Sequence, residues 1–221
     1  MSKNIVQTCK PYAYQHLECD IKRLKRQYPF IHIEVIGHSV LGKGIYAIRL
    51  GQGEKELFYS GDWHANEYLT GHLLMKFIED YSQSFKNSQS ILRYNIEYLF
   101  QEYSIWIAPM VNPDGIDLVI HGLEQNNPYY EWILSINQNN LDFQNWTANA
   151  RGVDLNHQWP AKWEEEVKRS PQFPSPKRYG GEMPLSEPET KSIYNFVRRH
   201  DFEMVLAFHS QGKEIFGDSK V

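Results

Sequence analysis

The sequence has no excess of basic residues and no long apolar run. Lys and Arg total 23 against 27 Asp and Glu, for a formal net charge of −4. This balance provides no basic surface for nucleic acid, so we expect no such partner. No apolar run approaches the roughly 20 residues that span a bilayer, which argues against a membrane protein. Residues 1–20 contain no apolar stretch of about 7–15 residues, so we expect no secretory signal and a cytoplasmic protein.

Cysteines are also scarce, and both lie near the N-terminus as Cys9 and Cys19. They could pair, but in a cytoplasmic protein two reduced thiols are the better interpretation. This excludes a small scaffold held together by disulfides. A chain of 221 residues is long enough to bury a full core. It has no repeat, linker or low-complexity tract, so we predict a single domain over residues 1–221.

Helical and strand-like patterns alternate along the chain. Apolar residues at helical spacing predict helices over 13–27, 66–81 and 91–101, and a capping box at Ser186 and Glu189 begins a helix that ends near His200. Short apolar runs predict strands at 31–36, 44–50, 56–60, 105–111, 152–156 and 204–208. Residues 112–115 predict a turn, and 121–150 and 157–184 predict long polar loops. This order is typical of an α/β sheet protein.

The spacing His-x-x-Glu lets two ligands converge on one metal ion at a turn or helix start. It occurs as His64–Glu67, His121–Glu124 and His200–Glu203. His200 ends an amphipathic helix, where a cationic side chain complements the helix dipole, and His121 lies in a polar loop. His64 is different, because it directly follows a predicted strand and precedes a predicted helix. Ligand sites of open α/β folds gather at this edge of the sheet.

His209 follows the last predicted strand, so it also belongs at a sheet edge. There it could meet His64 and Glu67 across the sheet. Two histidines and one glutamate are a ligand set of hydrolytic zinc sites. The alternative is an edge histidine that bonds a backbone carbonyl, and the residues alone leave both interpretations open.

Five motifs in order resemble the zinc carboxypeptidase family. The matching segments are Gly61-Asp62-Trp63-His64-Ala65-Asn66-Glu67, Asn112-Pro113-Asp114-Gly115, Gly152-Val153-Asp154-Leu155-Asn156, Pro184-Leu185-Ser186-Glu187-Pro188-Glu189-Thr190 and Phe208-His209-Ser210-Gln211-Gly212. They span most of the chain. Within the family, residues 39–46 and 149–156 are most similar to bacterial γ-D-glutamyl-meso-diaminopimelate peptidases, which cut cell-wall peptides.

The resemblance implies a mixed central sheet flanked by helices on both faces. It also implies one Zn²⁺ per chain, held by His64, Glu67 and His209, that activates water and polarises the scissile carbonyl. Asn156 would then hold a substrate carboxylate or amide. The implied substrates are peptides or muropeptides, cleaved at the γ-D-glutamyl–diaminopimelate bond.

The sequence departs from the family pattern near the substrate. His157 stands where digestive carboxypeptidases have an arginine, and a histidine cannot form that bidentate contact with a C-terminal carboxylate. Thr147 stands where the family has a cation that polarises the carbonyl. Arg151 is the nearest cation that could substitute, with a surface position as the equal alternative.

The general-base glutamate of the family comes well after the second histidine, so we expect it beyond Val221. A sheet without this C-terminal part should have an exposed edge. Two alternatives to the muropeptidase therefore stay open. One is a truncated zinc-binding remnant without efficient turnover, because general bases contribute about 10²–10⁴-fold in rate. The other is a small-molecule amidase or deacylase on the same zinc scaffold.

Overall fold

The computed structural model describes residues 4–7 and 9–212. Its centre is a five-stranded sheet in the order β1-β2-β6-β3-β7. The strands are β1 (His32–His38), β2 (Gly44–Gly51), β3 (Lys55–Ser60), β6 (Tyr103–Ala108) and β7 (Phe202–Ala207). The pairs β1–β2 and β2–β6 are antiparallel, whereas β3 runs parallel to β6 and β7. The sheet is therefore mixed.

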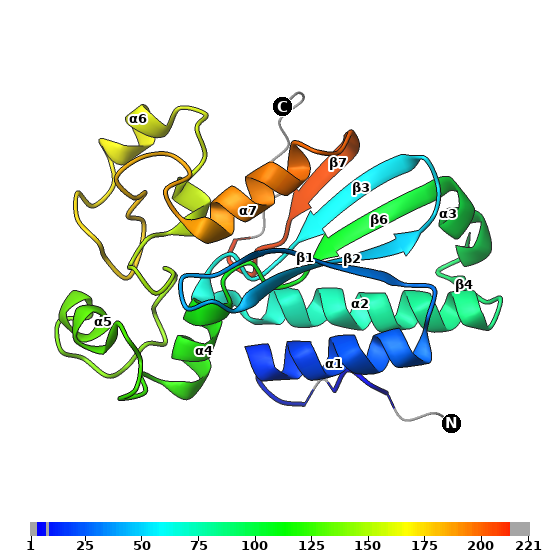
Figure 1. Cartoon of the computed structure of the whole chain (residues 1–221), viewed down its shortest axis with the longest axis horizontal. Helices are drawn as coiled ribbons and strands as arrows, with labels where there is room; N and C mark the ends of the chain where they lie inside the picture. Colours follow the sequence, from blue (N-terminus) through cyan, green and yellow to red (C-terminus); the bar gives the residue numbers. More distant parts are fainter. Residues whose placement is uncertain (1–3, 8, 213–221) are drawn as a thin grey trace.

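Helices lie on both faces of this sheet, with α1 and α2 on one side and α7 on the other (Figure 1). The α-helices are α1 (Tyr14–Gln27), α2 (Leu69–Lys86), α3 (Ile96–Glu102), α4 (Pro113–His121), α5 (Tyr130–Ile136), α6 (Trp163–Val167) and α7 (Pro188–Val197). There are also two 3-10 turns: η1 (Ala65–Glu67) follows β3, and η2 (Leu155–His157) precedes α6. The predicted α/β class with a mixed, doubly covered sheet is confirmed.

The two faces of the sheet bury separate apolar clusters. Successive side chains of a strand point to opposite faces, so β2 sends Ile48 to the α2 side and Ala47 to the α7 side. On the first side Ile78 of α2 is fully buried. On the second, the rings of Phe58 in β3 and Phe196 in α7 lie 5.5 Å apart. Packing on both faces fixes the sheet whose edge carries the candidate site.

Strand β7 forms an edge of the sheet. Within the described residues it pairs with β3 alone. Its apolar residues Met204 and Val205 are 40% and 44% exposed. The exposed edge predicted from the sequence is therefore present.

Two further expectations concern composition. Among the helices that the structure describes, none has the length and apolar character to cross a bilayer. Cys9 and Cys19 are exposed and form no disulfide with each other.

The helix predicted over 91–101 is wrong in its first half. A small hairpin, formed by β4 (Ser90–Ile91) and β5 (Tyr94–Asn95), takes its place. Leu92 and Arg93 between them have φ values of 48° and 75°, as a tight two-residue hairpin turn requires. Asn95 then caps α3 by accepting a backbone hydrogen bond. Apolar spacing of the helical kind gave no sign of this turn.

The strand predicted at 152–156 is also wrong. The side-chain oxygen of Asn149 accepts hydrogen bonds from the amides of Arg151 and Val153, at 3.0 and 3.1 Å. These bonds fold the segment into a turn, with Gly152 at φ 76°. Asp154 then begins η2 by accepting from the amide of Asn156. Side chains that bond the backbone just ahead of them compete with strand pairing, which explains the difference.

The polar stretches 121–150 and 157–184, predicted as loops, contain the short helices α5 and α6. The starts of α4 and α7 also differ from the predictions. The residues predicted as a turn at 112–115 begin α4, where Asn112 accepts from the Gly115 amide and Pro113 takes the first helical position. The predicted capping box before α7 does not form, because Glu187 is the capping residue. The Ser186 hydroxyl donates instead to Gln158, at 3.1 Å.

Candidate metal centre

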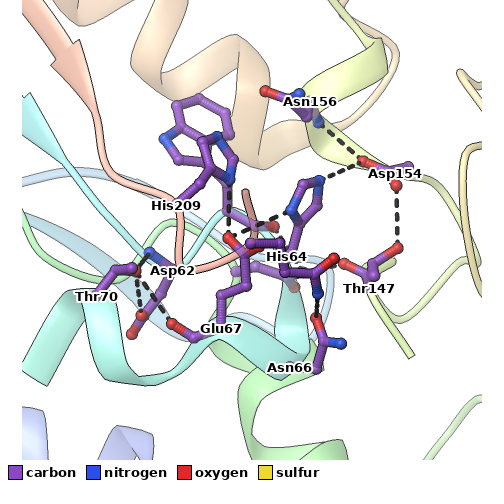
Figure 2. Close-up of polar contacts among 12 residues, drawn as sticks. Asp62, His64, Asn66, Glu67, Thr70, Thr147, Asp154, Asn156 and His209 are labelled. Atoms are coloured by element: carbon purple, nitrogen blue, oxygen red, sulfur yellow. Dashed lines mark hydrogen bonds and ion pairs between the residues drawn. The ribbon is translucent and has the colours of Figure 1, made fainter. Parts of the chain in front are cut away.

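Two histidines and one glutamate meet at one edge of the sheet (Figure 2). His64 and Glu67 lie between β3 and α2, and His209 follows β7. Because β3 and β7 are parallel neighbours, the segments that leave their carboxyl ends emerge at the same edge. This topology brings His209 to Glu67, although 142 positions separate them.

The Glu67 carboxylate lies between the two imidazole rings. Its Oε2 atom is 2.8 Å from Nδ1 of His209 and 3.4 Å from Nδ1 of His64. The Glu67 side chain is 1% exposed, whereas those of His64 and His209 are 17% and 25% exposed. One ligand atom from each residue lies within 4.8 Å of the others. The group is thus closed on the Glu67 side and accessible on the histidine side.

His64 is held by a fourth residue, Asp154, whose role sequence reasoning missed. Oδ1 of Asp154 lies 3.3 Å from Nε2 of His64, which leaves Nδ1 of that ring facing Glu67 (Figure 2). The buried Asp154 carboxylate also accepts from the Thr147 hydroxyl and the Arg178 amide, both at 3.0 Å. A carboxylate on the outer nitrogen fixes the ring orientation and the tautomer of a metal-binding histidine. Asp154 lay inside a recognised motif, but only the fold shows that this loop returns to His64.

These contacts shift the pKa values of the group in the protein alone. Burial lowers the pKa of His64, but Asp154 and Glu67 outweigh it and raise that pKa to about 9. Burial raises the pKa of Glu67, but His209 and His64 outweigh it and lower that pKa to about 2. Contact with His64 also lowers the pKa of Asp154, to about 2. The Glu67 and Asp154 carboxylates therefore stay ionised at neutral pH and favour a positive charge between them. A divalent cation can supply this charge in place of the His64 proton.

The residues present fit a zinc ion. Oε1 of Glu67 is buried and has no hydrogen-bond partner among the residues that the structure describes. A buried carboxylate oxygen of this kind calls for a donor or a cation. Two imidazole nitrogens and one carboxylate oxygen are also a donor set of hydrolytic zinc sites, which leave a position for water or substrate. His64, Glu67 and His209 are therefore the residues that would hold the metal.

Comparison with known proteins agrees with this geometry. The family model described as zinc carboxypeptidase matches residues 17–217. The chain belongs to the zinc carboxypeptidase family. It is 42% identical over 205 residues to gamma-D-glutamyl-L-diamino acid endopeptidase 1 of Lysinibacillus sphaericus, a match that covers 93% of this chain and 52% of that protein.

Other relatives show the same partial overlap. The chain is 34% identical over 219 residues to the uncharacterized protein YqgT of Bacillus subtilis (strain 168), covering 98% of this chain and 58% of that protein. It thus spans little more than half the length of these curated relatives. The solved structure of bovine thrombin-activatable fibrinolysis inhibitor in complex with tick carboxypeptidase inhibitor matches with a TM-score of 0.69 at 20% identity. That match covers 91% of this chain and 61% of the other, and it shows a shared fold.

The positions at which this chain departs from the family pattern have specific partners. Thr147 is buried, and its hydroxyl donates to Asp154 at 3.0 Å and to the main-chain oxygen of Pro176 at 3.2 Å. Nδ1 of His157 lies 3.0 Å from a carboxylate oxygen of Glu166 in α6. Asn156 is exposed beside Asp154, at the same edge as the three ligands (Figure 2). Substrate binding by Asn156 and His157 stays a prediction.

Arg151, the cation that could replace the missing one, has its own partners. Its Nη1 atom lies 3.7 Å from Oε2 of Glu187, and a hydrogen bond with the Tyr129 hydroxyl raises the pKa of its guanidinium. These contacts do not include His64, Glu67 or His209. A role for Arg151 in polarising a carbonyl stays a prediction that these contacts do not support.

The buried carboxylate of Glu189 joins the first turn of α7 to two other segments of the chain. Glu189 has no exposed surface and accepts from the amide of Val40 at 3.1 Å and from the side chain of Asn149 at 3.3 Å. Burial, together with the neighbouring Asp114 and Glu187 carboxylates, raises the pKa of Glu189 to about 8. Glu189 is therefore held neutral in the folded protein at pH 7.

This raised pKa predicts that stability depends on pH through Glu189. The folded protein keeps a proton that the unfolded chain loses above pH 4.5, so the stabilising contribution is present below pH 4.5 and disappears as pH rises through about 8. We expect the free energy of unfolding to fall by a few kcal/mol more in the wild type than in Glu189→Gln between pH 5 and pH 8. Urea unfolding of both proteins at the two pH values measures this difference. The exposed Glu54→Gln is the control, and equal pH slopes for wild type and Glu189→Gln would contradict the prediction.

Proposed function

We propose that the chain is a zinc-dependent peptidase domain that hydrolyses cell-wall muropeptides at the γ-D-glutamyl–diaminopimelate bond. The observation that carries the proposal is the convergence of His64, Glu67 and His209, with both Nδ1 atoms directed at one carboxylate. The choice of bond is supported by the relative at 42% identity, whose name specifies a γ-D-glutamyl-L-diamino acid linkage.

Each residue of the site has a defined task in this proposal. Zinc, when bound, supplies Lewis-acid polarisation of the substrate carbonyl and activation of water. Asp154 accepts a hydrogen bond from Nε2–H of His64 and so keeps Nδ1 as the ligating atom. Asn156 would hold a substrate carboxylate or amide at the exposed edge. Since His157 cannot replace an arginine fork, trimming of ordinary C-terminal residues is disfavoured.

A second function, zinc binding without efficient turnover, is favoured by the carboxylates around the site. Within the described part of the chain, the carboxylates in contact with the two histidines are Glu67 and Asp154. Both are engaged with imidazole nitrogens, so neither is placed to act as a general base. A site without that base would be slower by about 10²–10⁴-fold.

Incubation of the zinc-loaded protein with L-Ala-γ-D-Glu-meso-diaminopimelate tests both functions. We expect release of diaminopimelate, followed by chromatography, and no release by His209→Ala. No release from protein that holds one zinc per chain would favour the second function. Preferential cleavage of an N-acyl amino acid over the tripeptide would instead identify a small-molecule amidase or deacylase.

A further inference from the structure

Residues 4–7 form neither a helix nor a strand, and they lie against α1 and α2. Ile5 and Val6 are 9% and 1% exposed and belong to the apolar cluster on that face of the sheet. Burial of two aliphatic side chains favours docking of the segment even though it pairs with no strand. The segment is therefore held by side chains of the two helices, in the manner of a bound peptide.

Charged side chains of both helices bind the main chain of this segment. Glu79 of α2 is 3% exposed, and its carboxylate accepts from the amides of Ile5 and Val6, at 2.6 and 3.2 Å. Arg23 of α1 donates to the main-chain oxygen of Ile5 at 3.1 Å. Hydrogen bonds to an ionised partner are stronger than neutral ones. Because they contact main-chain atoms, they suit an extended peptide whose side chains are apolar.

His72 connects the segment to the start of α2. Its Nε2 atom donates to the main-chain oxygen of Gln7 at 2.8 Å, and its ring stacks on that of Tyr12 with centroids 4.6 Å apart. The Tyr12 hydroxyl in turn donates to Asp20 of α1 at 3.1 Å. His72 and Tyr12 are 6% and 2% exposed, so packing fixes both rings. This attachment ends next to Gly71 in the first turn of α2.

The first turn of α2 also contacts the segment that carries two of the candidate ligands. The amide of Gly71 and the hydroxyl of Thr70 donate to the Asp62 carboxylate, at 2.7 and 2.9 Å (Figure 2). Asp62 precedes His64 by two positions. The Thr70 hydroxyl also lies 3.1 Å from the main-chain oxygen of Glu67. A displacement of this helical turn would therefore change the geometry of both ligands.

We propose that α1 and α2 form a binding site for an extended apolar peptide, that residues 4–7 occupy it, and that this occupation raises the zinc affinity of the metal centre. The inference rests on the proposed function, because it concerns regulation of the same metal centre. Detachment of the segment leaves the Glu79 carboxylate without its amide partners and releases the first turn of α2. Coupling between sites that do not touch changes an affinity by about 3–30-fold.

A shortened chain that begins at residue 10, together with a synthetic peptide of residues 1–8, tests the inference. We expect the shortened chain to bind zinc about 3–30-fold more weakly than the full chain, measured by competition with a chromogenic chelator. Saturating peptide should restore the affinity. A peptide with Val6→Asp should not restore it, because the substitution places a charge at a buried apolar position.

The reverse measurement is the affinity of the peptide for the shortened chain with and without zinc, followed by calorimetry. Binding free energies are reciprocal, so zinc must strengthen peptide binding by the same factor by which the peptide strengthens zinc binding. A segment that only covers apolar surface gives a factor of one in both directions. That result, or a peptide that does not bind the folded shortened chain, would overturn the inference.

Should the shortened chain fail to fold, two variants of the full chain test the same coupling. Glu79→Ala removes the acceptor of the two amides, whereas Asp80→Ala removes an exposed carboxylate at the next position of α2. We expect Glu79→Ala alone to speed hydrogen exchange at the Ile5 and Val6 amides and to weaken zinc binding. Faster exchange with unchanged zinc affinity, or equal losses of zinc affinity in both variants, would contradict the inference.

Hydrolysis and coupling fail separately. Cleavage of the tripeptide by full and shortened chains of equal zinc affinity would overturn the inference and leave the proposed function intact. Zinc binding that depends on the peptide, without cleavage by the zinc-loaded full chain, would support the inference and count against the peptidase.

Discussion

Replacing His209 by alanine should remove zinc from the protein. We expect about one zinc per purified wild-type chain and none in His209→Ala after dialysis. His209 would supply one of two nitrogen ligands, and it lies 2.8 Å from the Glu67 carboxylate. Loss of an outer partner of a metal ligand already costs about 10–100-fold in affinity, so loss of a ligand itself should cost more. Elemental analysis of both proteins measures the difference.

The matched control is His121→Ala. His121 has the same His-x-x-Glu spacing to Glu124 as His64 has to Glu67, but it lies exposed at the end of α4. Its replacement should leave the zinc content unchanged. Zinc should also raise the unfolding midpoint of wild type and His121→Ala, because a ligand that binds the folded state stabilises it. Zinc retained by His209→Ala, or lost from His121→Ala, would mean that the ion binds elsewhere.

The elements that hold this site were predictable where one local signal dominates. Strands β2 and β3 and helix α1 are continuous apolar patterns between clear breaks, and the structure places them within a residue or so of the prediction. The hairpin before α3 and the turn at Asn149 were missed for a shared reason. In both, side chains or positive φ values redirect a few residues inside an otherwise regular pattern. Patterns averaged over several residues do not detect such local competition.

The three candidate ligands that the structure brings together could be predicted from the sequence, whereas the residues that hold them in place could not. His64 and Glu67 carry a local spacing, and His209 ends a strand, so each has a signal within its own segment. Asp154 has none, since its contact with His64 depends on the return of a loop to the edge between β3 and β7. Likewise, the pairing of Arg151 with Glu187 depends on the buried Asn149. Residues that act through contacts distant in sequence become visible only in the fold.

Replacing Gly71 by alanine should destabilise the fold by about 3 kcal/mol or more. Gly71 lies in the first turn of α2, against the end of β3 and the end of β6. A Cβ atom there would overlap the carboxylate of Asp62 and the main-chain oxygen of Pro109. Asp62 cannot retreat easily, because it has no exposed surface and accepts from the Gly71 amide at 2.7 Å and from the Thr70 hydroxyl at 2.9 Å.

The same substitution should weaken zinc binding, because Asp62 and Gly71 flank the segment that carries His64 and Glu67. Urea unfolding and zinc titration of Gly71→Ala measure the two effects. Gly44→Ala is the control, since the nearest atom to its Cβ is the Tyr14 hydroxyl at 3.4 Å, an ordinary contact. Alanine stabilises a helix relative to glycine by up to about 1 kcal/mol. The measured loss of stability in Gly71→Ala is therefore smaller than the steric cost alone. Stability equal to wild type would show that α2 can move away from Asp62 freely, and the ligand turn would then not be fixed by this contact.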